Sequence, residues 1–124
     1  MIYDSDKVVI RMAKEMGLNH LEFKFIGHLD LQSSKDAAKV WFKVFEKYPE
    51  MTYSLVWDCT YMSGFDIEAR KIWYDHLKIF KVRIIDVVVI SPKILIRGAA
   101  RVMLEFFGLE SRIVKNRKDL LIPA

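Results

Sequence analysis

The chain of 124 residues contains a single cysteine, Cys59. One thiol cannot form an internal disulfide, and the sequence has no CxxC pair or Cys/His cluster of the kind that binds zinc. Long apolar runs are also missing, since none approaches the roughly 20 residues of a membrane-spanning helix. The first residues, with Asp4 and Asp6, lack the basic start and apolar stretch of a secretory signal. These absences predict a protein of a reducing compartment, by default the cytoplasm.

Motifs for nucleotide and metal chemistry are also lacking. The sequence has neither a Walker loop nor a GxGxxG turn. His20, His28 and His76 are widely separated, and the local pairs that they form with nearby aspartates have no special spacing. Structural or surface roles therefore suit the histidines better than catalysis. We expect a protein that is not an enzyme and that carries no cofactor and no metal.

Positive charge is in slight excess and unevenly distributed. The formal net charge is +4; residues 1–60 carry 8 Lys/Arg and 9 Asp/Glu, whereas residues 61–124 carry 12 and 7. A solvated surface accounts for this uneven distribution of charge. The alternative is that the basic residues form a surface that binds an acidic partner or a lipid headgroup. The basic residues are too sparse for a nucleic-acid footprint, so we expect no nucleic-acid partner.

The chain contains enough hydrophobic residues to form a core. Its composition is 52% hydrophobic and 29% charged, which is typical of a globular protein of one domain. We expect a single domain over residues 1–124 with a core at about 7–121. Apolar periodicity predicts strands at 7–12, 20–29, 52–58, 84–90 and 111–115, the first two as an antiparallel hairpin.

Three amphipathic helices are predicted between the later strands. Ser33 or Ser34 is expected to cap the first helix, which Pro49 stops. Asp66 is expected to cap the second, over 67–81, and the third begins after Ser91-Pro92 and ends at Gly108. The order ββαβαβαβ implies an α/β fold with a mixed, mostly parallel sheet of about five strands and helices packed on it. A short helix or tail is expected over 117–122.

The strand-to-helix junction at residues 55–66 is the first candidate site. The apolar run ends at Asp58, a loop over 59–65 is expected to follow, and Asp66 opens the next helix. Ligands and partners of open α/β sheets bind at the carboxyl ends of strands. Asp58 and Asp66 are better suited to capping backbone N–H groups than to acid/base catalysis, and Cys59 is expected to be a small buried residue.

Several segments in this order resemble the STAS domain superfamily, the fold of bacterial anti-sigma-factor antagonists. The matching segments are Gly27 to Asp30, Leu55 to Asp58, Met62 to Asp66, Val87 to Pro92 and Phe107 to Leu109. The resemblance implies a regulatory module that binds a protein partner. The segment from Gly64 to Asp66, with Trp73, Leu77 and Lys78, also resembles a STAS-like branch akin to Sec14-like lipid-binding domains.

The sequence departs from the family pattern at the position where signalling members are regulated by phosphorylation. Signalling members carry a phosphorylatable serine just after the aspartate that opens this helix, but here Asp66 is followed by Ile67, Glu68 and Ala69. Glu68 brings a permanent negative charge close to a helix N-terminus, where it is favourable. Serine phosphorylation at that position is therefore excluded, and Ser63 in the preceding segment is a substitute site that the sequence leaves open.

Two further features bear on binding. Lys93, Arg97 and Arg101 recur every four residues and so share one helix face, which is either solvated or contacts an anion or headgroup. Apolar residues, from Ile94 and Leu95 to Phe106 and Phe107, are expected to fill the rest of that helix. The aromatic residues Trp41, Phe42, Trp73, Phe106 and Phe107 either belong to the core or line an apolar ligand cavity.

We therefore predict a non-enzymatic STAS-like module that contacts a protein through loop 59–65 and the following helix. Its predicted partner-binding residues are Asp58, Ser63, Gly64, Asp66 and Glu68. The alternative is a small domain that binds an apolar ligand, a lipid or a membrane surface, with Lys93, Arg97 and Arg101 as the headgroup contacts. A second copy of the chain, in a homodimer, is also left open as a partner.

Overall fold

Six strands form one mixed sheet whose spatial order follows the chain order, from β1 to β6. The computed structural model describes residues 1–121. The strands are β1 (Tyr3–Asp4), β2 (Val8–Met12), β3 (His20–Leu29), β4 (Tyr53–Phe65), β5 (Ile84–Ile90) and β6 (Ser111–Val114). The helices are α1 (Leu31–Lys47), α2 (Ile67–Phe80) and α3 (Ile94–Phe106), with short 3₁₀ turns η1 (Lys14–Met16), η2 (Lys81–Arg83) and η3 (Arg117–Leu121).

The pairing is antiparallel from β1 to β3 and parallel from β3 to β6. This confirms the predicted hairpin and the mostly parallel sheet. The additional strand β1 was not predicted, because two residues are too few to show a periodicity. The predicted tail corresponds to η3, and residue 122 lies outside the described residues.

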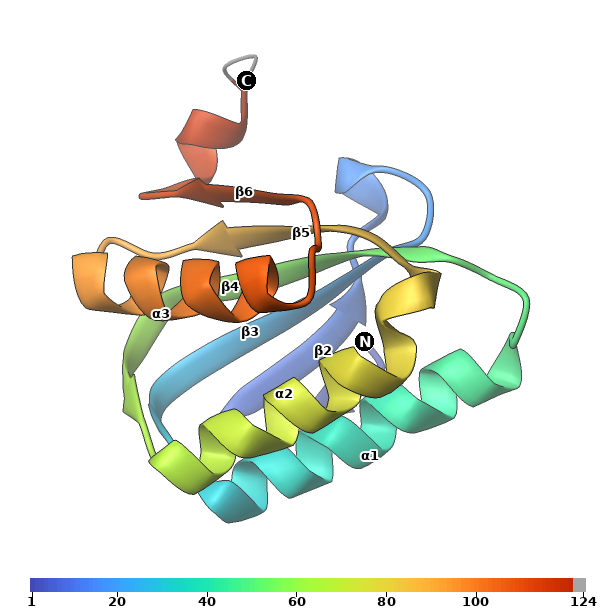
Figure 1. Ribbon diagram of the computed structural model, residues 1–124, viewed down its shortest axis with the longest axis horizontal. Helices are drawn as coiled ribbons and strands as arrows, with labels where there is room; N and C mark the ends of the chain where they lie inside the picture. The colour runs from blue at the N-terminus through green and yellow to red at the C-terminus, as the bar shows by residue number, and fades with distance from the viewer. Residues whose placement is uncertain (122–124) are drawn as a thin grey trace.

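All three helices lie on one face of the sheet (Figure 1). Alternate residues of each strand point to that face, as a pleated strand requires. Aromatic rings fill much of the layer between sheet and helices. The Phe23 ring of β3 lies 5.4 Å from that of Trp41 and 5.7 Å from that of Trp73, both edge-on. The indoles of Trp41 and Trp73 therefore belong to the core.

The first helix is capped by a residue other than the predicted ones. Asp30, in extended conformation, is the N-cap of α1, and its side chain accepts a hydrogen bond of 2.7 Å from the Ser33 backbone N–H. Ser34 is buried instead, and its hydroxyl accepts a hydrogen bond of 3.1 Å from Trp73 Nε1. The prediction that Ser33 or Ser34 caps this helix was wrong. Strand β3 ends at Leu29, and the helix begins directly after Asp30.

Helix α3 exposes several of the apolar residues that were predicted to lie beside its polar stripe. Its buried residues are Ile96, Ala100, Met103 and Leu104. Ile94, Leu95, Val102 and Phe106 are exposed large apolar side chains. The end of the helix was predicted well, because Gly108 has a positive φ of 66° and its N–H bonds to the Glu105 carbonyl. Packing in the core therefore does not account for the exposed apolar residues of α3.

Candidate functional site

The segment 59–65 is not a loop. It continues β4, which runs from Tyr53 to Phe65 alongside β3. Two register shifts interrupt the pairing, one between Lys24 and Ile26 and one between Gly27 and His28 of β3. At each shift β4 carries one residue more than β3, which is the mark of a β-bulge. A loop was predicted for this segment because the bulges break the alternation of side chains that is expected of a regular strand.

Asp58 lies within β4, on the face of the sheet opposite the helices. It is 8% exposed, whereas its neighbours Trp57 and Cys59 pack into the core on the helix side. Its Oδ1 accepts a hydrogen bond of 3.0 Å from the Thr60 N–H, and its Oδ2 lies 3.0 Å from Arg117 Nη2. Burial alone would raise the pKa of Asp58, but the bonds from Thr60 and Arg117 outweigh it and hold the pKa below its usual range. The prediction that Asp58 ends the strand was wrong, and its carboxylate is already paired within the chain.

Asp66 and His28 meet where β4 leads into α2. His28 Nε2 lies 2.7 Å from Asp66 Oδ1, and the two side chains are 52% and 44% exposed. Asp66 is the N-cap residue of α2, as predicted, but its carboxylate forms no capping hydrogen bond. The sequence offered this histidine only a nearby aspartate at no special spacing, and the actual partner is 38 residues away. This pair joins the end of β3 to the start of α2.

A shallow groove lies beside this junction, and we call it the end groove. Its walls are Ser63, Gly64 and Phe65 of β4 together with Lys93, Ile94, Leu95 and Ile96 at the start of α3. Lys93 Nζ donates a hydrogen bond of 3.3 Å to the Ser63 carbonyl, which ties the two walls together. Ile94 is 73% exposed and Leu95 is 84% exposed. Two predicted partner-binding residues, Ser63 and Gly64, thus lie beside exposed apolar side chains.

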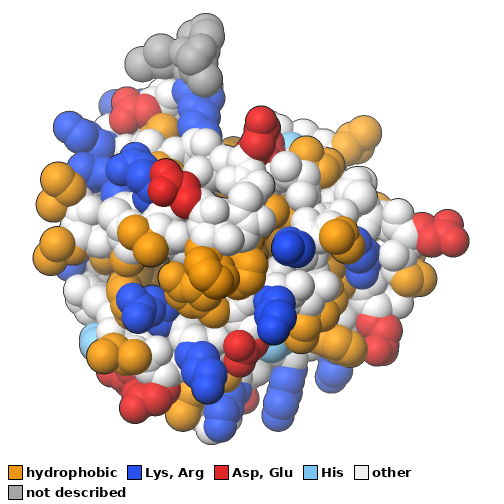
Figure 2. All heavy atoms as spheres, in the orientation of Figure 1, with side chains coloured by type: hydrophobic (Ala, Val, Ile, Leu, Met, Phe, Trp, Pro, Cys, Tyr) orange, Lys and Arg blue, Asp and Glu red, His pale blue; other side chains and the backbone are white. Residues whose placement is uncertain are grey.

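Helix α2 adds to the surface near the end groove. Its first residue, Ile67, is 75% exposed, and Glu68 is the acidic residue of its first turn. The helix-bearing side of the molecule shows basic and apolar side chains intermingled (Figure 2). Large apolar side chains in such positions are characteristic of interaction sites when they gather into one patch.

The predicted basic face of α3 is partly engaged within the chain. Lys93 contacts Ser63, as described, and Arg97 Nη1 donates a hydrogen bond of 2.9 Å to the Ser91 carbonyl. Arg101 is exposed. The three residues therefore differ in their availability to an anion, since Lys93 and Arg101 are exposed and Arg97 is half-buried.

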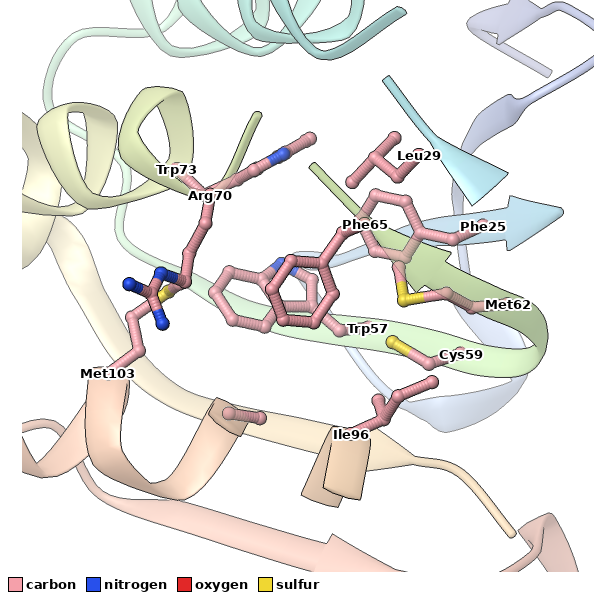
Figure 3. Close-up of a pocket in the computed structure, with 11 residues that line it drawn as sticks. Phe25, Leu29, Trp57, Cys59, Met62, Phe65, Arg70, Trp73, Ile96 and Met103 are labelled. Carbon is pink, nitrogen blue, oxygen red and sulfur yellow. The ribbon is translucent and has the colours of Figure 1, made fainter. Parts of the chain in front are cut away.

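An apolar cavity of about 60 Å³ lies between α2, α3 and the sheet (Figure 3). Trp57, Met62 and Phe65 of β4 line it together with Trp73 of α2 and Met103 of α3. Of the described residues that line it, only Arg70 is charged. Of the aromatic residues for which the sequence left core and cavity open, Trp73 lines the cavity, while Phe42 and Phe106 are exposed.

Two polar groups in the cavity wall have distinctive surroundings. Trp57 Nε1 is buried and has no hydrogen-bond acceptor among the described residues. Such a donor costs about 1–3 kcal/mol relative to a paired one. Cys59 is buried, as predicted, and burial raises the pKa of its thiol strongly, with the Asp58 charge adding to the effect. The thiol is therefore neutral at physiological pH.

No metal-binding cluster is seen among residues 1–121. No group of three potential His, Cys, Asp or Glu ligands comes together in this part of the chain. His76 Nδ1 lies 3.1 Å from the Ile72 carbonyl of its own helix, and His20 Nδ1 lies 3.0 Å from the Leu18 carbonyl. Within the same residues, no helix combines the length and apolarity needed to span a bilayer.

Comparison with known proteins shows the SpoIIAA-like, STAS-like fold. An uncharacterised protein of the DUF3478 family from Shewanella loihica PV-4, with a SpoIIAA-like fold, superposes with a TM-score of 0.78 at 17% identity, over 98% of this chain and 96% of that one. The anti-sigma factor antagonist SpoIIAA in its unphosphorylated form gives 0.64 at 10% identity, over 93% and 94%. The phosphorylated form of the Bacillus cell fate determinant SpoIIAA gives 0.61 at 11% identity, over 92% and 96%.

The likeness is one of structure. No protein-family model matches the sequence, and the search of curated proteins finds no match. The predicted resemblance to the STAS superfamily is thereby confirmed at the level of the fold.

Proposed function

We propose that this domain is a non-enzymatic regulatory module that binds a protein partner through the end groove and the first turn of α2. The observation that carries the proposal is the exposure of Ile67, Ile94 and Leu95 around one junction. The fold that it shares with an anti-sigma factor antagonist supports a protein partner in general.

The chemistry of the surface suits a partner with both apolar and charged groups. Ile94 and Leu95 offer apolar area, while Lys93, Asp66 and Glu68 supply charges of both signs at its edge. An apolar centre with a polar rim is the usual arrangement of a specific interface. Asp58 takes no part in this surface, because its carboxylate faces the other side of the sheet.

Phosphorylation plays no part at the position after Asp66, since Ile67, Glu68 and Ala69 have no hydroxyl group. Glu68 supplies a lasting negative charge there. We propose that binding is constitutive at this end of the molecule. Ser63 is exposed on β4 and stays a candidate for modification.

Charge reversal tests the proposal. The domain and its variants Asp66→Lys and Glu68→Lys are used to capture partners from a lysate of the source organism, and a captured protein is then purified for affinity measurements. Glu46→Lys is the matched control, because Glu46 is exposed on α1, away from the end groove. We expect the first two changes to weaken binding and the control to leave it unchanged, while circular dichroism shows all variants folded.

A second candidate function is supported by the cavity between α2 and α3. It would bind a small apolar ligand, in line with the predicted resemblance to Sec14-like domains. Mass spectrometry of the purified protein under native conditions would detect such a ligand as an added mass. Its absence, together with no response of the cavity residues to apolar probes, would contradict this second function.

A further inference from the structure

We infer that the chain has a second docking surface, a groove along α1 that binds an amphipathic protein segment with acidic residues on its edge. The inference goes beyond the function proposed above, because this groove and the end groove lie at opposite ends of β4. Tyr53, the first residue of β4, lines the new groove, and Phe65, the last residue, lines the end groove. We call the new surface the side groove.

The side groove has a mostly apolar lining. It lies where α1 packs beside β2, at the opposite side of the helix layer from α3 (Figure 1). Its volume is about 530 Å³, which is comparable to that of ligand pockets. Apart from Tyr53, its apolar residues are Ile2, Met12, Val40, Val44, Tyr48 and Met51. Ile2 and Tyr48 are exposed and the other four are half-buried, so the groove has an accessible rim and an apolar floor.

The charged residues that line the side groove are all basic. Among residues 1–121 they are Lys43 and Lys47, which lie one turn apart on α1 and are exposed. Neither forms an ion pair within those residues, and the recorded contact of Lys47 is with the Tyr48 ring, 5.5 Å from its Nζ. Glu46 and Glu50 are exposed but do not line the groove. Two ammonium groups without carboxylate partners, beside an apolar groove, are complementary to acidic side chains of a partner.

Arg83 holds one end of the side groove in place. Its Nη2 donates a hydrogen bond of 2.7 Å to the Tyr48 carbonyl, and its Nε donates one of 3.1 Å to the Met51 carbonyl. The Met51 N–H also donates to the Tyr48 carbonyl, at 3.1 Å. These bonds fix the backbone that links α1 to β4. The groove is therefore formed before a partner arrives, and binding loses less free energy to the ordering of its wall.

The shape of the side groove favours a protein segment over a lipid surface. A helix that lays its apolar face into a groove is a common mode of peptide recognition. The flexible thioether side chains of Met12 and Met51 can adjust to the apolar residues of such a segment. A flat bilayer surface would leave the half-buried Val40 and Val44 without contact. The geometry and the charge thus agree on an acidic, amphipathic segment.

Nuclear magnetic resonance of the full chain, labelled with ¹³C at its methionine methyl groups, tests the inference. Met12 and Met51 line the side groove, whereas Met62 and Met103 line the cavity between α2 and α3 and serve as internal controls. The probe is a synthetic helical peptide with leucines on one face and glutamates along both edges, and its analogue has glutamine at each glutamate. We expect the Met12 and Met51 signals to move, the two control signals to stay, and the glutamate peptide to bind about tenfold more tightly.

Two pairs of lysines on α1 separate the side groove from general charge. Replacing both Lys43 and Lys47 by glutamine should abolish the preference for the glutamate peptide. Replacing both Lys35 and Lys39 by glutamine is the matched control and should keep it, because these lysines are exposed on the same helix and do not line the groove. Asp66→Lys should leave the peptide affinity unchanged, so that a failure of the end groove and a failure of the side groove are seen separately.

Four outcomes would overturn the inference. Equal affinities for the two peptides would refute an acidic partner, and unmoved Met12 and Met51 signals would refute the groove as the site. Equal effects of the two double lysine replacements would show attraction by general charge. Phosphatidylglycerol vesicles that shift the Met12 and Met51 signals, with no response to the peptide, would make a membrane surface the occupant instead.

Discussion

Arg117 and Glu22 are 95 residues apart in the chain, yet Arg117 Nη2 lies 2.8 Å from Glu22 Oε1 on the sheet face that the helices leave uncovered. Arg11 Nε binds the other carboxylate oxygen of Glu22 at 2.8 Å, and Arg117 also reaches Asp58. Two buried carboxylates are thus balanced by two arginines. The network fastens η3 across β3 and β4, and it accounts for Asp58 as a structural residue.

Replacing Arg117 by alanine should destabilise the domain. The change removes one cation from two carboxylates that are 3% and 8% exposed, and it leaves Glu22 with Arg11 alone. We expect a loss of about 1–3 kcal/mol in the free energy of unfolding, measured with urea. Lys118→Ala is the control, because Lys118 is exposed on the same turn; its effect should stay within about 0.5 kcal/mol. Equal effects of the two changes would contradict the network's role.

The same network predicts a dependence of stability on pH. The pKa of Asp58 is lower in the folded than in the unfolded chain, so its contribution is present above the unfolded pKa of about 4 and is lost as pH falls through the folded value. The wild-type chain should therefore exceed Asp58→Asn in stability at pH 7, and the difference should shrink toward pH 3. Urea unfolding of both chains over this range measures it, and a difference that does not change with pH would refute the assignment.

Asp30 should be more important to α1 than either serine that follows it. Its carboxylate accepts the Ser33 N–H, and this hydrogen bond lowers its pKa. Asp30→Ala should lower the stability of the domain, as the loss of an N-cap does, whereas Asp30→Asn keeps the acceptor and most of the stability. Thermal unfolding of the two variants compares them. If asparagine proved as harmful as alanine, capping would not be the role of Asp30.

Cys59 should react slowly with thiol reagents in the folded protein. Burial both hides the sulfur and raises the pKa of the thiol, so little thiolate forms near pH 8. A disulfide reagent that releases a coloured thiol should label the urea-unfolded chain at once and the native chain only as fast as it opens. Rapid labelling of the native protein would show that the α2–α3 cavity admits the reagent.

Regular elements were predictable from the sequence, and irregular ones were not. The strand over 84–90 was predicted with its observed bounds, because its apolar run is compact and broken only by Asp86. Beyond Asp58, β4 was missed because a bulged strand loses the alternation by which strands are recognised. The N-cap Asp30 was missed because the serines three and four residues later are equally good capping residues.

The contacts around the junction at residues 55–66 could not be predicted from the sequence. The approach of His28 to Asp66 depends on the parallel pairing of β3 with β4, which local sequence does not encode. Likewise, the exposure of Ile94 and Leu95 depends on the rotation of α3 against the sheet; apolar residues surround much of that helix and leave its buried side undefined.

The most direct test of a protein-binding role is the affinity of a purified native partner for four chains: wild type, Asp66→Lys, Glu68→Lys and the control Glu46→Lys. Calorimetric titration at equal salt concentration measures it. We predict that Asp66→Lys and Glu68→Lys each weaken binding about tenfold or more, while Glu46→Lys binds as the wild type does. A partner that binds all four chains with the same affinity would contradict the assignment of the end groove and the start of α2 as the contact surface.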